Sequence, residues 1–422
     1  TERRNRRADR AGDEPFAPIY TEADALAAWR LCHPIPLDDW FEPARGFRAR
    51  LWNAGHILGS ASVEIAAGGT SVLCSGDIGP NNKMFQLDPT GPVGVDHIVC
   101  EGTYGGRRRE PVTIGERRQL LRAEVLAARA RGGNLVIPVF ALERTQELLL
   151  DLAFLLRSGA IPEAPVFVDS PLANRATEVF ARYAGGLEDT GHANVFDHPE
   201  FHFVADTAES IRLNAISGAI ILAASGMCEG GRIRHHLVHN LHRRESTVLF
   251  VGYQARGSLG RVILDGAQSV RISGADVRVR AQIRQIDSYS AHADHGELLA
   301  WIAARGPIAG GLFLDHGEPD ALEALRRDLQ RTDPELGVVL PQIGERYALS
   351  AGRPARRLAT ASERARLAVG RDWQNAYAEL VTGLKRDLAR IPDDRRRQEA
   401  IARMREVLAS YAQTKNGRAD HR

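Results

Sequence analysis

The sequence lacks several features that mark common protein classes. No apolar run approaches the about 18 residues that a membrane-spanning helix needs, and no signal-peptide pattern opens the chain. Four cysteines lie far apart without a C-x-x-C pair, which excludes a zinc knuckle and a disulfide scaffold. No G-x-x-x-x-G-K-[ST] motif is present, so ATP binding is not implied. We therefore expect a soluble globular protein of the reducing cytoplasm, with no membrane partner.

Lysine is also scarce, since it occurs only at Lys83, Lys385 and Lys415. Arginine supplies the rest of the 55 basic residues, and the net charge is only +2. Codon bias in a GC-rich genome explains this preference without any functional role. Arginine is nevertheless the better bidentate phosphate ligand, so a nucleic-acid partner stays open. The length of 422 residues suits two or three domains.

Five polar side chains share one structural context, because each follows or lies near an expected strand end in a glycine-punctuated loop: His56, Asp77, Glu101, His292 and His316. The strands expected beside them cover residues 47–53, 62–66, 70–75, 95–100 and 310–314. Taken singly, each residue is more often a turn former or a surface group than a ligand. Strand ends at one edge of an open α/β sheet converge, however, and histidine with carboxylate is a zinc-type ligand set. The group therefore indicates a metal site.

From about residue 109 to 254 the sequence alternates regularly between helix-like and strand-like segments. Continuous apolar runs such as Asn134–Phe140 and Ala219–Ala224 are typical of a parallel sheet covered on both faces. Residues 268–286 alternate instead, as half-exposed antiparallel strands do. This middle block is expected to be a compact α/β domain of its own.

The tail, residues 351–422, has apolar side chains at helical spacing in two segments, Trp373–Leu388 and Ile401–Tyr411. We expect a charged helical hairpin that packs on the core or on another subunit, which would make a homodimer. An RNA-facing arm is the less favoured alternative.

Two further candidates carry weaker signals. His235, His239 and His242 lie along one helix face without the glutamate of H-E-x-x-H, so a solvated polar face is favoured. Ala224-Ser225-Gly226 does not match the G-x-S-x-G nucleophile elbow.

Several short motifs resemble a known family. They are G-H-I-L-G-S-A at 55–61, S-G-D at 75–77, E-G-T-Y-G at 101–105, S-A-H-A-D at 290–294 and D-H-G-E at 315–318. Supporting blocks are P-V-F-A-L-E-R-T-Q-E at 138–147, D-S-P-L-A at 169–173, S-G-M-C-E-G-G-R at 225–232 and G-Y-Q-A-R-G-S-L-G-R at 252–261. In this order they resemble the β-CASP branch of the metallo-β-lactamase-fold nucleases, over about residues 15–350.

The resemblance implies an α/β fold, with an αββα metallo-β-lactamase sandwich that carries an inserted α/β β-CASP domain and a C-terminal helical hairpin. The corresponding segments are 1–108 and 255–350 for the two parts of the metallo-β-lactamase domain, 109–254 for the β-CASP domain and 351–422 for the tail. It also implies a zinc-dependent ribonuclease, in which two Zn²⁺ ions activate a bridging hydroxide that attacks an RNA phosphodiester. Endonuclease and 5′→3′ exonuclease action both stay open.

Residue roles follow from the same resemblance. His56, Asp77 and His316 match metal-ligand positions, and Asp77 is the carboxylate that bridges the two ions. His292 matches the group that protonates the leaving oxygen, and Glu101 the group that orients it. Four residues match blocks that line the RNA cleft: Ser225, Gly226, Arg232 and Ser290.

One departure from the family pattern is large, because the ligand motif His-x-His-x-Asp-His is missing. Three ligands shared by two ions fall short of the about three protein ligands that each zinc ion takes. Everything missing is N-terminal and Thr1 is not a start residue, so we expect a truncated sequence that binds zinc poorly and is inactive. The alternative is a non-catalytic RNA-binding or scaffold paralogue. A small-molecule metallo-hydrolase is disfavoured, since the inserted domain has no obvious use there.

Overall fold

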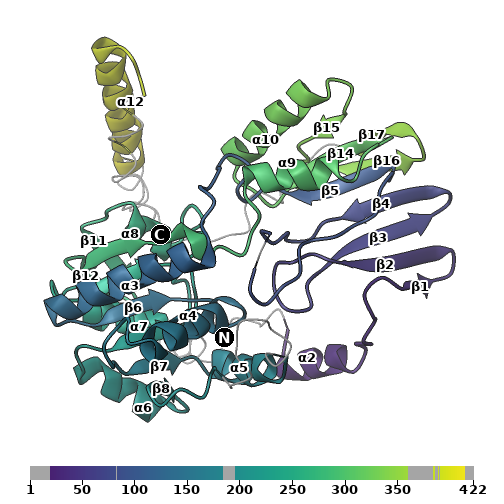
Figure 1. Ribbon diagram of the computed structural model, residues 1–422. Coiled ribbons are helices and arrows are strands. Elements are labelled where there is room, and N and C mark those ends of the chain that lie inside the picture. The colour runs from purple at the N-terminus through teal and green to yellow at the C-terminus, as the bar shows by residue number, and fades with distance from the viewer. Residues whose placement is uncertain are drawn as a thin grey trace, which may run out of the picture.

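The computed structural model describes residues 20–81, 83–183, 195–359 and 390–413, together with residues 384 and 388. Two sheets with their helices form two bodies that lie side by side (Figure 1). One sheet has seven strands in the order β1-β2-β3-β4-β5-β14-β15, and the other has six in the order β13-β10-β6-β9-β7-β8. The second sheet is inserted between β5 and β14 of the first. The expected α/β class with an inserted domain is therefore confirmed.

The seven-stranded sheet consists of β1 (Trp40–Ala44), β2 (Phe47–Asn53), β3 (Ala61–Ala67), β4 (Thr70–Cys74), β5 (His97–Glu101), β14 (Gly311–Asp315) and β15 (Val338–Val339). Strands β1 to β4 pair antiparallel, and the pairs from β4 to β15 are parallel. Helices α9 (His295–Ala303) and α10 (Pro319–Thr332) cover one face, where Leu298 and Leu325 pack in one core with Ile98. Glu101 and Asp315 are paired residues, so β5 and β14 end at the same edge.

The six-stranded sheet consists of β6 (Leu135–Pro138), β7 (Val166–Asp169), β8 (Phe201–Phe203), β9 (Ile220–Ala223), β10 (Thr247–Phe250) and β13 (Gln282–Gln285), and all its pairings are parallel. Helices around it are α3 (Ile114–Arg131), α4 (Arg144–Arg157), α5 (Pro171–Tyr183), α6 (Thr207–Arg212), α7 (Ile233–Asn240) and α8 (Leu259–Leu264). Helices α3 and α4 pack in one core and α7 and α8 in another, and the strands β6, β9 and β10 between them are completely buried. Burial on both faces explains the continuous apolar runs.

The segment from 268 to 286 differs in part from the expectation. β11 (Ser269–Ile272) and β12 (Ala275–Arg278) form the expected antiparallel hairpin, but β13 pairs parallel with β10 at the edge of the six-stranded sheet. The inserted sheet thus extends beyond residue 254, where the change in sequence texture suggested its end. A short edge strand shows the same alternation whichever way its neighbour runs, so the pattern alone does not give the direction.

The remaining elements lie outside the two sheets. Helix α2 (Glu22–Trp29) begins at Thr21 with a capping box and buries no side chain. β16 (Arg346–Ser350) and β17 (Arg353–Ala359) pair antiparallel.

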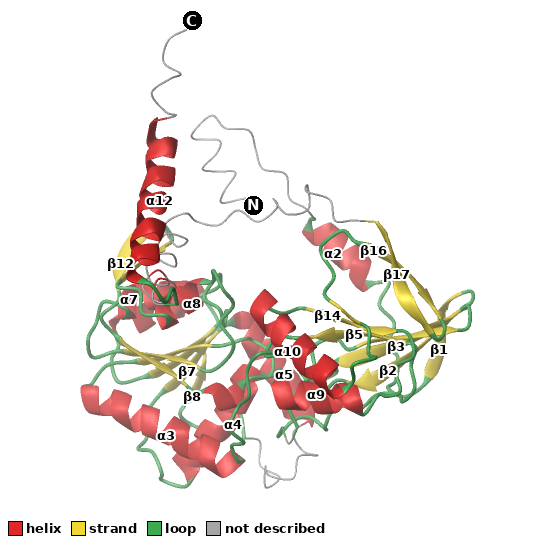
Figure 2. Ribbon diagram, turned by 90° about the horizontal axis from the view of Figure 1, so that it is seen from above, coloured by secondary structure: helices red, strands yellow, loops and turns green. Residues whose placement is uncertain are grey.

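The second half of the expected tail hairpin is α12 (Asp394–Gln413), and most of the first half, residues 373–383, lies outside the described residues. Helix α12 projects away from both sheets, so the structure does not show it packing along the core (Figures 1 and 2). None of the described helices is long and apolar enough to cross a membrane.

Candidate metal and acid–base site

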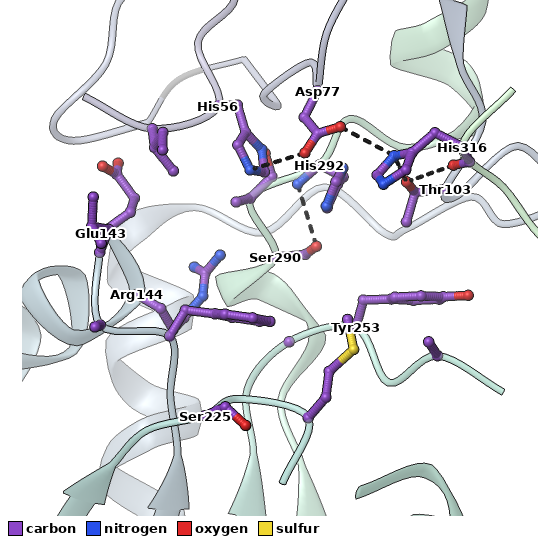
Figure 3. Close-up of a pocket in the computed structure, with 18 of the residues that line it drawn as sticks. His56, Asp77, Thr103, Glu143, Arg144, Ser225, Tyr253, Ser290, His292 and His316 are labelled. Carbon is purple, nitrogen blue, oxygen red and sulfur yellow. Dashed lines mark hydrogen bonds and ion pairs between the residues drawn. The ribbon is translucent and has the colours of Figure 1, made fainter. Parts of the chain in front are cut away.

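The structure brings together all five polar residues singled out in the sequence. His56 lies in the loop between β2 and β3, Asp77 and Glu101 follow β4 and end β5, and His292 and His316 precede α9 and follow β14. His56, Asp77, His292 and His316 line one cavity of about 1030 Å³, whose opposite side is formed by the inserted body (Figure 3). Glu101 is only 1% exposed and lies behind them.

Close backbone packing places His56 beside Asp77. The amide of Gly79 donates to the carbonyl oxygen of Ala54 at 2.8 Å, so the loop after β4 lies directly on the loop after β2. A Cβ atom at position 79 would lie 1.8 Å from the carbonyl oxygen of Gly55, which only glycine avoids. The glycines of this stretch therefore allow the two loops to meet.

Asp77 lies between two imidazole rings. Its Oδ1 is 3.1 Å from His316 Nδ1 and its Oδ2 is 3.7 Å from His56 Nε2. The hydrogen bond from His316 holds the pKa of Asp77 below its ordinary value against the opposing effect of burial, and Asp77 in turn raises the pKa of His316. The carboxylate is therefore ionised and available to bridge two positive centres.

His56 is held as a neutral imidazole. Burial, reinforced by the nearby His292, lowers the pKa of His56 to about 4. Its Nδ1 is 3.0 Å from the carbonyl oxygen of Ala291, which assigns the proton to Nδ1 and leaves Nε2 on the side of Asp77. A backbone carbonyl that orients a neutral ring in this way is the usual support for a metal-ligating histidine.

Glu101 and His292 form a second pair. His292 Nδ1 lies 2.9 Å from Glu101 Oε1, and the same carboxylate accepts the amides of Ile78 at 2.8 Å and Thr103 at 3.1 Å. Burial acts to raise the pKa of Glu101, but these hydrogen bonds, with that from His292 the largest, outweigh it and lower the pKa. The ionised carboxylate orients the ring and leaves His292 Nε2 for the cavity.

The donor atoms fit a borderline metal such as zinc. Two overlapping groups have ligand atoms within 4.8 Å of one another, namely His56, Asp77 and His292, and Glu101, His292 and His316. Both groups include His292, whereas the sequence motifs assign the metal to His56, Asp77 and His316. We favour the motif assignment, because Glu101 already engages Nδ1 of His292. Imidazole nitrogens with one carboxylate are a zinc-type donor set.

The four residues expected in the RNA cleft lie at different places. Ser225 and Ser290 line the cavity. Gly226 packs against the ring of Phe140, and Arg232 lies outside the cavity with its guanidinium on the buried carboxylate of Asp169. Phosphate contact by these four residues stays a prediction.

The histidines of α7 do not join the site. His235 and His242 are exposed and His239 is half-buried, as a solvated face requires. Their neighbour His236 is completely buried, and its Nε2 is 2.6 Å from Asp169 Oδ2. This helix therefore anchors the inserted sheet through a histidine that the spacing did not single out.

Sequence reasoning missed the contacts that tie the site to the inserted body. Lys83 Nζ donates to the carbonyl oxygen of His56 at 2.8 Å and to Glu143 Oε1 at 3.1 Å. The other oxygen of Glu143 accepts the amide of Leu58 at 3.2 Å. The loop of His56 is thus fastened to the start of α4. The rarity of lysine was the available signal for Lys83.

Residues around His316 were also missed. Thr103 Oγ1 donates to the carbonyl oxygen of His316 at 3.2 Å and supports its left-handed backbone, with a φ of 46°. On the opposite side of the cavity, the hydroxyl of Tyr253 donates to Glu318 Oε1 at 2.9 Å. Both lie in blocks of family resemblance, but their partners are far away in the chain.

Two family models match the chain. Residues 145–263 match the Beta-Casp domain, and residues 276–341 match the Zn-dependent metallo-hydrolase RNA specificity domain. A relative called ribonuclease TTHA0252, from Thermus thermophilus, is 34% identical over 342 residues, which are 79% of this chain and 76% of the relative. The chain belongs to the β-CASP family of the metallo-β-lactamase fold. This confirms the resemblance found in the short motifs.

Other β-CASP relatives carry different names. An RNase J-like protein from Methanocaldococcus jannaschii is 32% identical over 306 residues, which are 71% of this chain and 70% of the relative. The transcription termination factor FttA from Cenarchaeum symbiosum is 29% identical over 348 residues, which are 79% of this chain but 54% of that protein. The chain thus spans about half the length of this FttA relative.

Proposed function

We propose that this chain acts in the zinc-dependent hydrolysis of RNA phosphodiester bonds. The observation that carries the proposal is the meeting of His56, Asp77 and His316 with the Glu101–His292 pair at one cavity. Ligand-type and acid–base groups side by side in a cleft are what metal-assisted phosphodiester hydrolysis needs. The printed names of the ribonuclease relatives point to RNA as the substrate.

The residues of this chain divide into ligands and proton-transfer groups. His56 holds one zinc ion through Nε2, His316 holds a second, and Asp77 lies between them as the bridging carboxylate. When bound, the two ions supply Lewis acidity and generate a nucleophile from water at neutral pH. The ordered hydrogen bond of His56 to Ala291 keeps the ligand nitrogen in place before any ion binds.

His292 supports departure of the leaving group. As the phosphorus–oxygen bond breaks, Nε2 of His292 donates a proton to the leaving oxygen, while Nδ1 stays bonded to Glu101. Glu101 acts through His292 and is a positioning residue. Its burial and its two backbone hydrogen bonds keep the ring direction fixed during the proton transfer.

The test compares zinc content and RNA cleavage for two polypeptides, the chain as printed and the same reading frame extended upstream to its first start codon. We expect zinc-dependent cleavage by the extended polypeptide and its loss in His316→Ala. Circular RNA distinguishes the mode, because only an endonuclease cuts it. If the zinc-loaded extended polypeptide binds RNA without cutting it, the proposal fails.

One observation favours a second candidate, an RNA-binding or scaffold protein without catalysis. The chain offers three ligands by motif, and a hydrolytic zinc ion takes about three protein ligands of its own. RNA binding with no zinc retained in either polypeptide would support this candidate.

A further inference from the structure

The cavity has two chemically different walls. The metal-ligand and acid–base side chains form one, whereas the wall from the inserted body is largely apolar and includes Phe140, Leu142, Leu172 and Met227. Three of these side chains are strongly exposed, with Phe140 at 43%, Leu142 at 41% and Leu172 at 55%. Exposed apolar side chains gathered in a cavity usually mark a place where a ligand covers them.

Phe140 is fixed on both sides of its loop. Its carbonyl oxygen accepts the hydroxyl of Thr145 at 2.7 Å, and Glu143, three residues on, is anchored by Lys83. Its ring lies against the backbone of Gly226, where a Cβ atom would come within 2.7 Å of two ring carbons. The absence of a side chain at Gly226 therefore makes room for the ring. An exposed ring on a fixed loop is a preorganised surface.

The surroundings of Phe140 suit a nucleotide. Arg144 follows on the same loop, and its guanidinium points into the cavity (Figure 3). Tyr253 adds a second aromatic ring to the lining, and its contact with Tyr104 at 5.4 Å between ring centroids holds it in place. The volume of about 1030 Å³ exceeds what one nucleotide fills, so a base and its phosphate fit together.

We propose that the ring of Phe140 is a stacking platform for the base of an RNA nucleotide next to the phosphate at the metal site. The inference rests on the proposed function and adds a substrate contact to it. Every base has a π-face, so stacking on a phenylalanine ring gives affinity with little sequence preference. Gly226 then contributes to RNA binding by admitting the ring, independently of any phosphate contact.

The test measures fluorescence anisotropy of a labelled single-stranded RNA bound to the full chain in EDTA, so that cleavage does not compete. A single abasic nucleotide is moved along the RNA. One position should weaken wild-type binding about 5-fold to 150-fold, the range for base–aromatic stacking. Phe140→Leu should weaken binding of the intact RNA by a similar factor, and the abasic RNA should then bind no worse than the intact one. Phe140→Trp should restore sensitivity to the abasic position.

Phe154→Leu is the matched control, because Phe154 is 49% exposed on α4 and does not line the cavity. It should leave RNA binding unchanged. Gly226→Ala gives a second route to the same ring and should reduce the abasic effect in a chain with an unchanged melting temperature.

Three results would overturn the platform. They are an abasic penalty that persists in Phe140→Leu, an equal loss in Phe154→Leu, and an apolar occupant such as a peptide that protects Phe140 while RNA does not. If RNA binds but Phe140→Leu changes nothing, the platform fails and the proposed function stands. If the chain binds no RNA, both fail.

Discussion

The two sheets of this protein differ in how their strands are buried. In the six-stranded sheet every residue of β6, β9 and β10 is buried, whereas most residues of β2, β3 and β4 in the seven-stranded sheet are only half-buried. All five residues of the candidate site belong to the second, less buried body. The comparison indicates that the inserted body is a rigid scaffold, and that the ligand-bearing loops depend on contacts made across the cavity.

The largest effect is expected where the two bodies are joined. Lys83→Met removes the partner of Glu143, which is 1% exposed, and leaves a buried carboxylate unpaired. Loss of one member of a buried ion pair costs about 3–5 kcal/mol, and this loss should appear in urea unfolding. Arg326→Met breaks the exposed pair with Glu323 and should change nothing measurable. Equal effects of the two variants would show that the junction is not stabilised by the buried pair.

A pair of leucine truncations compares the sheets directly. Leu222 on β9 is completely buried, and Leu51 on β2 is half-buried. Leu222→Ala should cost about 2–5 kcal/mol of unfolding free energy, and Leu51→Ala clearly less, because less surface is withdrawn from water at that position. Equal losses in denaturant unfolding would contradict the difference in burial.

Acid should act through the junction. Burial would raise the pKa of Glu147, but Lys83, Arg144 and Arg117 outweigh it and hold the pKa well below its ordinary value. A lowered pKa in the folded state means that the stabilisation is present above the unfolded value of about 4.3 and is lost as the pH falls below it. Glu147→Gln should therefore flatten the loss of stability in acid relative to the wild type. An identical pH profile for both proteins would contradict this assignment.

The smallest effects should come from two helix caps. Thr113 caps α3, which buries Leu121 and Val125, and Thr21 caps α2, which buries nothing. Thr113→Ala should lower the unfolding free energy by about 1 kcal/mol. Thr21→Ala should leave global unfolding unchanged and increase only local hydrogen exchange in α2. A global loss in Thr21→Ala would show that α2 is coupled to the folded core.

Much of the fold followed from local patterns. The strand Phe47–Asn53 and the helix Ile114–Arg131 have the expected bounds, because alternation and helical spacing are strong over their lengths. The edge strand β8 was missed, since three residues carry too little pattern. Pairing direction was also out of reach for β13, where only tertiary contact decides it.

The candidate site divides in the same way. Positions such as Asp77 and Glu101 follow from strand ends and family motifs. The partners of Arg232 and Lys83 do not, because Asp169 and Glu143 lie some 60 residues away along the chain. Contacts of this kind between distant segments leave no periodic trace in the sequence.

Zinc binding by calorimetry tests the central claim most directly, with Asp77→Asn and Glu101→Gln as a matched pair. Asp77 is the proposed bridging ligand between His56 and His316, whereas Glu101 is engaged by His292 and two backbone amides. We expect Asp77→Asn to weaken zinc binding at least about tenfold, in the range seen when metal-site groups are removed. Glu101→Gln should stay close to the wild type. Equal losses, or a loss only in Glu101→Gln, would contradict the division of this site into metal ligands and a proton-transfer pair.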